Sequence, residues 1–500
     1  MAPSVRRLAL WVPFLATGHA ALLTSLPLDQ LRTAPTLFNN DDLRSLSSDR
    51  ISTQPVDFRE QHQLKIEQNS TICDAGSRHW TGHVPLGRGR DMFYWYFESL
   101  VMPEEAPLVI WTNGGPGGSS MLGAFFEIGP CRISPDGKTT RLNEHSWTRH
   151  ANILFIDQPI GVGLSATRDP SLWAMSLREG GMDVDKFLDV FLTDLFPELE
   201  GREIHFAGES FGGKYVPVYA AMTRRRFESV VLVDPYVDPA LHSLGSWGHF
   251  CPLGESERRE DRGGKITKGG LERYLNATAC EAMEGAYSKC ERARRACSDT
   301  YEEYVCRVAA RECEDVSKWW MDEIGPGGRD PYDDRSVCDR GIDLCHDMGQ
   351  DRTNVFFNLP HVKQALGLPE DFEYESISWG FSQAWSTLPD GIIPSTRELT
   401  ALLDDKHTRV LVMQGNNDGV IPTESIKQIF DELLWHGHAK FSRASYEPWH
   451  HLNADGTTSS GEVKSYGNLT VVIMDEAGHM SPHDQADAGV QLLGMWLGTL

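Results

Sequence analysis

The chain has 500 residues, of which 40% are hydrophobic, and its formal net charge at pH 7 is -24. This length suits either about three domains or a single α/β fold with insertions, and the apolar content is enough for a large core. The negative charge argues against nucleic acid or an anionic membrane surface as a partner, because both attract basic proteins.

Residues 1–20 are typical of a secretory signal peptide, because a basic start and the apolar run 8–16 precede small residues at Gly18 and Ala20. Residues 21–72 are polar and lack sustained periodicity, so we interpret them as a pro-segment or N-terminal arm. No later apolar run reaches the roughly 18 residues of a membrane span. After removal of the signal, no membrane span is expected.

Export predicts that the ten cysteines are paired. Three N-glycosylation sequons fit the same route, at Asn69, Asn276 and Asn468. We therefore expect a protein of the secretory pathway that ends outside the cell or in a vacuole-like compartment.

Folded structure is predicted to begin near Trp80 with a hairpin, because two β-patterned runs flank the turn Gly87–Arg90. Short apolar runs then alternate with helical stretches, among them 183–196, whose apolar side chains share one helix face. This alternation predicts a mainly parallel sheet with helices on both faces, built from residues 73–240 and 350–500. The apolar runs are 108–111, 153–156, 204–207, 230–233, 410–413 and 469–474.

The segment 241–349 interrupts this pattern and holds eight of the ten cysteines, so we interpret it as an insertion. Four of them form two pairs, each seven residues apart, which is about two turns of a helix. Two antiparallel helices would therefore form the nested disulfides Cys290–Cys313 and Cys297–Cys306. Metal ligation by these four thiolates is the alternative, which the wide spacing and the oxidising route disfavour.

Ser210 lies in the sequence Gly-Glu-Ser-Phe-Gly, between the apolar run 204–207 and the helix-compatible stretch 214–226. A strand, a G-x-S-x-G turn and a helix in this order form a nucleophile elbow, which projects the serine hydroxyl above the sheet. The alternative is a glycine-rich turn with a solvated serine.

A serine nucleophile needs a base and an orienting acid, which follow it in the order acid then histidine in α/β hydrolases. Asp418 and His479 each follow a predicted strand, so both lie where a parallel sheet presents its site. Asp234 also ends a strand and is a rival acid. The rival histidines are His450, His451 and His483.

The glycine-rich loop Asn113–Ser120 follows another predicted strand and suits an oxyanion hole, because glycines let the backbone approach a substrate. We assign the N–H groups of Gly115 and Phe211 as donors. A phosphate-binding loop is the rival, but the lysine and serine or threonine of a nucleotide loop are missing. His436 and His438 lack further nearby ligands for zinc, so no metal or cofactor is expected.

These residues resemble the serine carboxypeptidase family, in particular its fungal carboxypeptidase Y type, from about residue 73 onward. The resemblance implies an α/β-hydrolase fold, no metal, and removal of C-terminal residues from peptides or proteins with a free C-terminus. The matching motifs are WTNGGPGGSS (111–120), FFEIGP (125–130), NILFIDQPIGVGLS (152–165), GESFGGKYVP (208–217), PYDDRSVC (331–338), EVKSYGNLT (462–470) and AGHMSP (477–482).

The same resemblance implies roles for single residues. Ser210, Asp418 and His479 would form the catalytic triad. The substrate's C-terminal carboxylate would be recognised by Asn113, Gly114, Glu127 and Glu209. The implied disulfides of the insertion are Cys251–Cys280, Cys290–Cys313, Cys297–Cys306 and Cys338–Cys345.

The sequence departs from the family in three places. Gly118 and Ile377 replace two partner cysteines, and we predict that the remaining Cys73 and Cys131 pair with each other, as in a variant of the family. The family's G-N-G-x-x-D-P becomes V-D-P-Y-V-D-P at 233–239, and the usual aromatic stretch after the catalytic aspartate becomes 419–423. Side-chain specificity therefore cannot be copied from the family.

Glu127 and Glu209, if adjacent, would resist double ionisation, so at least one of their pKa values would rise. Protonated carboxyls donate hydrogen bonds to a substrate carboxylate, whereas ionised ones repel it, so peptide binding is expected to favour acidic pH. The base His479 must nevertheless be neutral. The alternatives are an acyltransferase or esterase with the same triad and, from another class, an inactive secreted binding protein.

Overall fold

The structure is a computed structural model that describes residues 64–167, 169–251, 275–322, 328–338 and 347–500. The expected signal peptide 1–20 and most of the expected arm 21–72 lie outside the described residues. The folded chain starts before Trp80, where the sequence had placed its beginning, because β1 (Ile66–Glu67) already pairs with β2. A strand of two residues is too short to show a period in the sequence.

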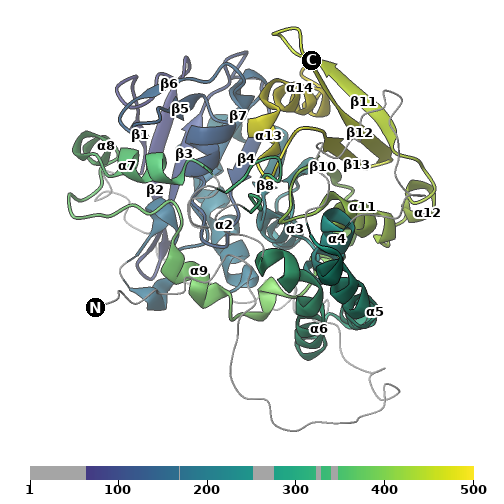
Figure 1. Ribbon diagram of the computed structural model, residues 1–500. Coiled ribbons are helices and arrows are strands. Elements are labelled where there is room, and N and C mark those ends of the chain that lie inside the picture. Colours follow the sequence, from purple (N-terminus) through teal and green to yellow (C-terminus); the bar gives the residue numbers. More distant parts are fainter. Residues whose placement is uncertain (1–63, 168, 252–274, 323–327, 339–346) are drawn as a thin grey trace. The chain divides into compact units, whose positions relative to one another are not determined.

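An 11-stranded sheet forms the core of the fold (Figure 1), in the order β1-β2-β3-β7-β4-β8-β9-β10-β13-β12-β11. The strands from β7 to β13 in this order are parallel, and antiparallel strands flank them on both sides. The predicted mainly parallel sheet is therefore confirmed. The strands after β1 are β2 (His79–Gly87), β3 (Arg90–Phe97), β4 (Leu108–Thr112), β7 (Asn152–Ile156), β8 (Ile204–Glu209), β9 (Ser229–Val233), β10 (Arg409–Gly415), β11 (Glu447–Leu452), β12 (Thr458–Tyr466) and β13 (Leu469–Met474), with the separate pair β5 (Cys131–Ile133) and β6 (Thr140–Leu142).

Alternate residues of each parallel strand face two different apolar cores, one on each side of the sheet. In β4, Leu108 and Ile110 pack into a core with the helices α2, α3, α10 and α11. Val109 and Trp111 pack into a second core with α7 and α14. Strands buried on both faces read as continuous apolar runs, which explains why the sequence located them well.

Helices cover the sheet, and the helix expected over 183–196 begins earlier, at Leu177, because Ser176 caps its N-terminus. It continues as a π-helical turn, Phe191–Leu195. Within the described residues, no helix combines the length and apolar character needed to cross a membrane. The α-helices are α2 (Leu177–Val190), α3 (Gly212–Met222), α4 (Pro239–Phe250), α5 (Ala277–Thr300), α6 (Glu303–Asp322), α7 (Gln350–Phe357), α8 (Pro360–Ala365), α9 (Trp379–Trp385), α10 (Thr396–Asp404), α11 (Thr423–Glu432), α12 (His438–Phe441), α13 (Ser481–Asp484) and α14 (Ala486–Leu497).

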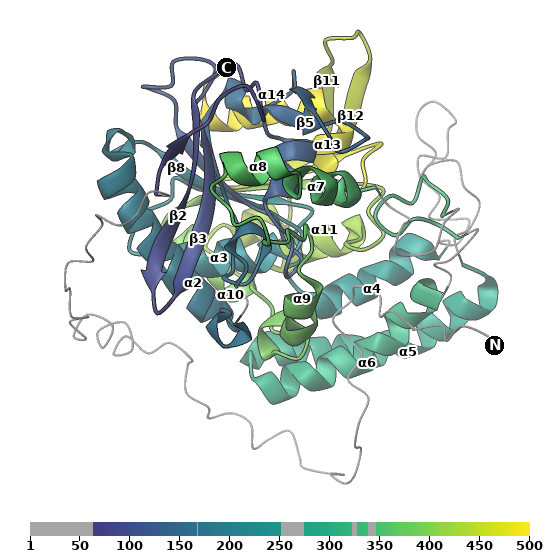
Figure 2. The same cartoon turned by 90° about the vertical axis from the view of Figure 1, so that its left-hand side faces the viewer.

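The insertion contains α4, α5 and α6, which lie together in both views (Figures 1 and 2). Disulfides Cys290–Cys313 and Cys297–Cys306 join α5 to α6, as the helix spacing predicted. Cys251–Cys280 joins the end of α4 to α5, and Cys73–Cys131 joins the N-terminal segment to β5. Cys345 lies outside the described residues, so Cys338–Cys345 stays a prediction.

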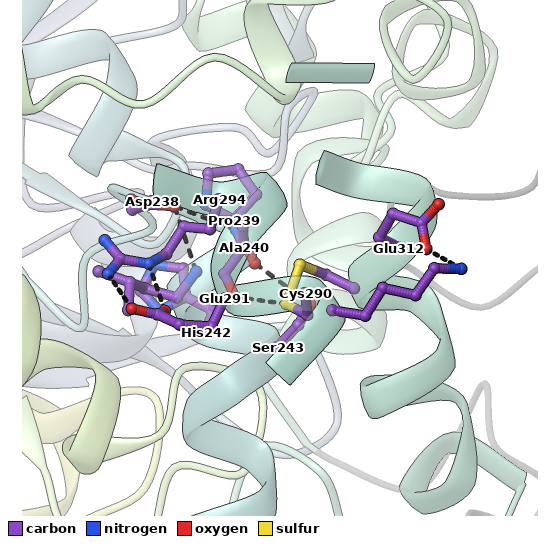
Figure 3. The surroundings of a disulfide bond; sticks show 12 residues. Asp238, Pro239, Ala240, His242, Ser243, Cys290, Glu291, Arg294 and Glu312 are labelled. Atoms are coloured by element: carbon purple, nitrogen blue, oxygen red, sulfur yellow. Dashed lines mark hydrogen bonds and ion pairs between the residues drawn. A yellow bond between two sulfur atoms is a disulfide. The ribbon is translucent and has the colours of Figure 1, made fainter. Parts of the chain in front are cut away.

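A buried arginine with two carboxylate partners stabilises the insertion next to the disulfide of Cys290 (Figure 3). Arg294 on α5 is only 4% exposed, and it contacts Glu291 at 2.8 Å and Glu432 of α11 at 3.1 Å. Cys290 packs against α4 one turn earlier, with its sulfur 3.9 Å from the carbonyl oxygen of Ala240. The helical hairpin is therefore fixed to the sheet region by charge as well as by packing.

Candidate active site

Four titratable or nucleophilic residues directly follow parallel strands that lie side by side. Ser210 follows β8, Asp234 follows β9, Asp418 lies just beyond β10, and His479 lies just beyond β13. Because parallel strands end at the same edge, these residues share one edge of the sheet. This is the edge at which open α/β sheets bind their ligands.

Ser210 has the backbone conformation of a nucleophile elbow. Its φ angle is 58°, a left-handed conformation that is uncommon for residues other than glycine. The N–H of Ser210 still donates to Val233 O of β9 at 3.0 Å, and its carbonyl accepts from Gly213 N at 2.9 Å and Tyr236 N at 2.7 Å. The surrounding strands and helix therefore hold this strained turn in place.

His479 and Asp418 form a buried pair, with 2.6 Å between Nδ1 and Oδ2. The other oxygen, Asp418 Oδ1, accepts from the N–H groups of Val420 at 2.8 Å and Ile421 at 2.9 Å. In the described chain this is the one hydrogen bond of the His479 ring, so Nε2 stays available for a serine hydroxyl. The arrangement orients the imidazole as a general base would need.

The glycine-rich loop approaches the elbow closely. A Cβ atom placed on Gly114 would lie 2.4 Å from Phe211 N and 2.8 Å from Ser210 Cβ, so only glycine fits there. The N–H groups of Gly115 and Phe211 donate no hydrogen bond to any described residue. Phe211 N also lies at the N-terminus of α3, where the helix dipole favours negative charge. Both assigned oxyanion donors are therefore available to a substrate, and the loop that carries Gly115 lies against the elbow that carries Phe211.

A buried carboxylate, Asp157, holds the glycine-rich loop from the end of β7. Its Oδ1 accepts from Ser120 N at 2.7 Å and Ser119 Oγ at 2.9 Å, while Oδ2 accepts from Leu164 N at 2.7 Å. Burial raises the pKa of Asp157 to about 6, against these hydrogen bonds, which lower it. Asp157 lies in the motif 152–165, and no role was predicted for it from the sequence.

Gly118 and Ile377, which replace two family cysteines, lie next to each other in an isolated antiparallel bridge. A Cβ on Gly118 would lie 3.8 Å from Ile377 Cδ1. Ser378 N donates to Gly117 O at 2.8 Å, so backbone contacts connect the loop to α9 where a disulfide is missing.

Two glutamates form a buried carboxyl pair beside the elbow. Each of Glu127 and Glu209 affects the ionisation of the other, and both oxygens of Glu127 and Oε2 of Glu209 lack a hydrogen-bond donor within the described residues. Two neighbouring carboxyl groups can share a hydrogen bond only if one of them is protonated. Burial raises the pKa of Glu127 well above its ordinary value, and the charge of Glu209 raises it further. Burial also raises the pKa of Glu209.

Asn113 fixes the orientation of this carboxyl pair. Its side-chain oxygen accepts from Trp111 Nε1 at 2.8 Å and Gly123 N at 3.0 Å, so its amide nitrogen must point the other way. That nitrogen donates to Glu209 Oε1 at 3.1 Å. The expected carboxylate-binding residues Asn113, Glu127 and Glu209 are therefore brought together, with Gly114 adjoining them in the chain.

His479 lies among several carboxyl groups. Burial lowers its pKa, but the charge and hydrogen bond of Asp418, together with the charges of Asp234 and Glu209, outweigh burial and raise it to about 9. Glu209 and Asp234 contribute only while they are ionised, and burial raises the pKa of both. Their share of the effect on the pKa of His479 therefore disappears as the pH falls.

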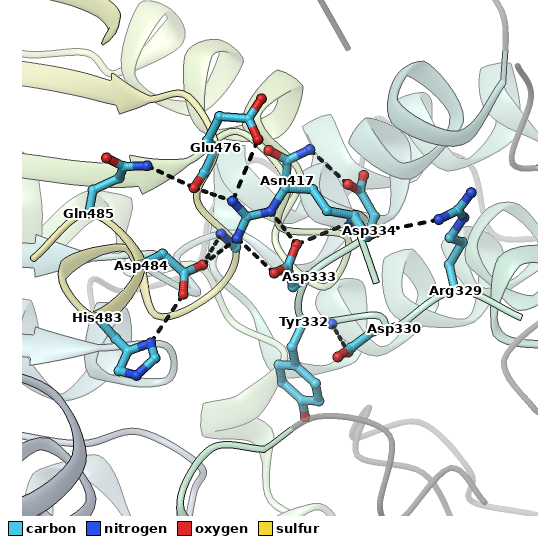
Figure 4. A network of polar contacts seen from close by, with 12 residues as sticks. Arg329, Asp330, Tyr332, Asp333, Asp334, Asn417, Glu476, His483, Asp484 and Gln485 are labelled. Atoms are coloured by element: carbon cyan, nitrogen blue, oxygen red, sulfur yellow. Dashed lines mark hydrogen bonds and ion pairs between the residues drawn. The ribbon is translucent and has the colours of Figure 1, made fainter. Parts of the chain in front are cut away.

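The segment 330–335 connects the loops that carry Asp418 and His479 (Figure 4). Pro331 O accepts from Gly419 N at 3.0 Å, and Tyr332 O accepts from His479 N at 2.7 Å. Arg335 contacts Asp333 at 2.7 Å and Asp484 at 2.8 Å, and Asp484 in turn accepts from Gly478 N. Most of this segment belongs to the motif PYDDRSVC (331–338), for which no role was predicted from the sequence.

The alternative candidates for the acid, the base and a metal site have other contacts. Asp234 is buried but accepts hydrogen bonds from backbone N–H groups and does not contact the His479 ring by a hydrogen bond. His483 stacks on Phe126 with 4.4 Å between ring centroids, and His436 Nδ1 contacts Asp404 at 2.7 Å. Among the described residues, no group of three or more histidine, cysteine or acidic side chains is placed to hold a metal ion. The last two rivals, His450 and His451, lie on β11.

Comparison with known proteins places this geometry in a family. The sequence profile described as serine carboxypeptidase matches residues 70–499. Carboxypeptidase Y homolog A of Ajellomyces capsulatus is 32% identical over 418 residues, which are 82% of this chain and 71% of that protein. Carboxypeptidase Y of Candida albicans is 30% identical over 467 residues, or 90% of this chain and 80% of that one.

The fold has a similar solved structure as well. The crystal structure of a prohormone-processing carboxypeptidase from Saccharomyces cerevisiae matches with a TM-score of 0.70 and 23% identity, over 87% of this chain and 96% of that one. This likeness supports the α/β-hydrolase fold with a helical insertion. The profile match over most of the chain, together with the carboxypeptidase Y relatives, shows that the chain belongs to the serine carboxypeptidase family.

Proposed function

We propose that this protein is a serine-type carboxypeptidase that releases C-terminal residues from peptides and proteins. The observation that carries the proposal is the buried Glu127–Glu209 pair directly beside the Ser210 elbow. A general esterase needs a nucleophile and an oxyanion hole, but it has no use for two carboxyl groups without cationic partners. A hydrolase that must recognise a terminal carboxylate does.

In the proposed mechanism, Ser210 Oγ attacks the last peptide carbonyl while His479 Nε2 takes its proton. Asp418 keeps the imidazole in the required orientation through its contact with Nδ1. The developing oxyanion receives hydrogen bonds from the N–H groups of Gly115 and Phe211. His479 then protonates the leaving amine, and water hydrolyses the acyl-enzyme after deprotonation by the same imidazole.

The terminal carboxylate would be bound by Asn113, Gly114 and the glutamate pair. In the protonated state, a carboxyl group of the pair donates a hydrogen bond to the substrate. In the doubly ionised state, the same two groups repel it across a low-dielectric site. Affinity for peptides is therefore expected to fall as the pH rises through the raised pKa values of the pair.

The glutamate pair also limits the effect of acid on the base. As Glu209 becomes neutral at low pH, it no longer raises the pKa of His479, so less of the neutral imidazole is lost as the pH falls. Binding of substrate and activity of the base thus become compatible over the same pH range. We infer that the enzyme works best under mildly acidic conditions.

The test compares a peptide with its C-terminal amide from pH 4 to 8, because the amide cannot form a carboxylate. We expect KM for the peptide to increase with pH and KM for the amide to change little. The same trend for both substrates would contradict the role of the glutamate pair. Mass-spectrometric digestion of a peptide mixture supplies the second readout: sequential loss of C-terminal residues supports a carboxypeptidase, and internal cleavage or no cleavage contradicts it.

We also propose export through the secretory pathway to the exterior or to a vacuole. Two of the expected glycosylation sites are exposed: Asn69, and Asn276, whose side chain caps α5 by accepting from Ala279 N at 2.9 Å. Asn468 is half-buried in the turn between β12 and β13. Endoglycosidase treatment followed by peptide mass mapping tests each site.

A further inference from the structure

Asp234 is a further buried carboxyl group at the site. It follows β9, is fully buried, and has a φ angle of 42°, a conformation that aspartate and asparagine tolerate better than most residues. Its Oδ1 accepts from Gly415 N at 2.6 Å, and its Oδ2 accepts from Ser481 N at 3.1 Å. Gly415 ends the strand before Asp418, and Ser481 lies two residues beyond His479.

Each oxygen of Asp234 therefore holds one of the two loops that carry the orienting acid and the base. A carboxylate suits this position better than an amide, because both of its oxygens accept hydrogen bonds. An asparagine offers one acceptor, and its amide nitrogen would face the second N–H group. The family pattern has asparagine here, so this chain differs from it by a negative charge at the centre of the site.

We propose, on the basis of the function inferred above, that Asp234 is a positioning residue that connects the Asp418 and His479 loops and, as a carboxylate, strengthens His479 as a base. The charged and titratable groups that act on this cluster are Asp418, His479, Glu127 and Glu209.

The donors distinguish Asp234 from Glu127. The carboxyl group of Glu127 accepts no hydrogen bond from an N–H group of the described chain, so protonation costs it little. Protonation of Asp234 would place a proton on an oxygen that already faces an N–H donor. Burial and the charge of Asp418 raise the pKa of Asp234 well above its usual range, while the His479 cation and both N–H contacts lower it. Because both of its oxygens accept from N–H groups, Asp234 is expected to keep its charge over the pH range in which His479 takes up its proton and to lose it only at lower pH, so the two titrate as a coupled pair.

The experiment measures the rate at which a serine-directed phosphonate labels Ser210 between pH 4 and 9. This probe has no C-terminal carboxylate, so the glutamate pair does not influence its binding, and the acid limb of the profile reports the ionisation of His479. In Asp234→Asn we expect this limb to move to lower pH by about one unit, because a nearby anion no longer stabilises the imidazolium. If Asp234 only held the two loops in position, its substitution would lower the maximal labelling rate and leave the acid limb of the profile at the same pH.

Asp238→Asn is the matched control. Asp238 is also buried and accepts from two backbone N–H groups, those of Ala240 and Leu241, but the charges that act on it are Arg294 and Lys214. In this control variant, the acid limb of the labelling profile should lie at the same pH as in the wild type. An unshifted limb in Asp234→Asn would mean that Asp234 is already neutral when His479 titrates, and would overturn the inference alone. No labelling of the wild type at any pH would contradict the proposed function as well.

If the asparagine variant does not fold, Asp234→Ser removes the same charge and keeps one acceptor. A measurement on the wild type completes the test, since NMR titration of the His479 ring requires no variant. A His479 pKa at or below the ordinary value of about 6.5 would overturn the inference.

Discussion

Buried charged groups have opposite surroundings at the catalytic edge of the sheet and in the helical insertion. In the insertion, the buried Arg294 has two carboxylate partners, Glu291 and Glu432. At the sheet edge, Glu127 and Glu209 are buried with no ion pair to lysine or arginine within the described residues. A paired charge fixes structure at one protonation state, whereas an unpaired carboxyl group keeps its proton exchangeable. The difference separates the part of the molecule that we expect to set stability from the part that we expect to respond to pH.

The largest expected effect removes the nucleophile. Ser210→Ala should lower kcat/KM for peptide hydrolysis by at least about 10⁴-fold, because the remaining site can only orient and stabilise. The substitution removes only a hydroxyl group, so the midpoint of thermal unfolding should stay close to that of the wild type. Ser171→Ala, at an exposed serine, is the matched control and should keep full activity. Activity of Ser210→Ala within tenfold of the wild type would refute the assignment of the nucleophile.

The second effect tests the paired charge of the insertion. Arg294→Ala removes the shared partner of Glu291 and Glu432 and should lower the free energy of unfolding by about 1.5–3 kcal/mol, because Glu432 is 39% exposed and Glu291 keeps Arg295 as a partner. Lys289→Ala, at a residue 60% exposed that pairs with Glu312, should change it by less than about 1 kcal/mol. Urea unfolding measures both. At urea concentrations too low to unfold either variant, the pH profile of activity should be the same in both. A shifted profile in Arg294→Ala would contradict the view that the insertion sets stability and not the response to pH.

The smallest effect concerns the unpaired carboxyl groups. The double variant Glu127→Gln and Glu209→Gln keeps hydrogen-bond donors but cannot ionise, so KM for a peptide should no longer rise with pH. Near pH 8 we expect its KM to lie about tenfold below that of the wild type, since the repulsion of the substrate carboxylate is removed. Glu105→Gln, at an exposed glutamate, should keep the wild-type dependence. A persistent pH-dependent KM in the double variant would place substrate recognition elsewhere.

The same variant has a predicted stability signature. Unfolded glutamates titrate near about 4.3, while the folded pair titrates at higher pH, so the folded state binds more protons between these values. The free energy of unfolding of the wild type should therefore decrease as the pH rises through that window. The double glutamine variant should lose this slope.

Most of the fold could be predicted from the sequence, because strands buried on both faces give long apolar runs and the helices between them indicate a mainly parallel sheet. The exposed hairpin β11–β12 was not predicted, since β11 alternates only between half-buried and exposed positions and gives little hydrophobic signal. The nested disulfides of the insertion were predictable because the spacing of cysteines on one helix face depends on local geometry alone.

The candidate site was predictable where residues follow strands, and less so where they act through distant backbone. Ser210, Asp418 and His479 could be located from strand ends and order. The contacts of Asp157 with Ser120 and of Asp234 with Ser481 could not, because each carboxylate accepts from the N–H group of a loop far away in the sequence. Strand-end position marked Asp234 as a candidate acid, but only the structure shows that its oxygens face Gly415 and Ser481.

The strand order also has a consequence for when the protein becomes active during its synthesis. Ser210 and its elbow are translated long before β13, which must pair between β10 and β12 before His479 reaches the sheet edge. A chain that stops short of β13 carries the proposed nucleophile without its base. Incomplete copies of this protein would therefore be inert toward the other proteins of the compartment in which they are made.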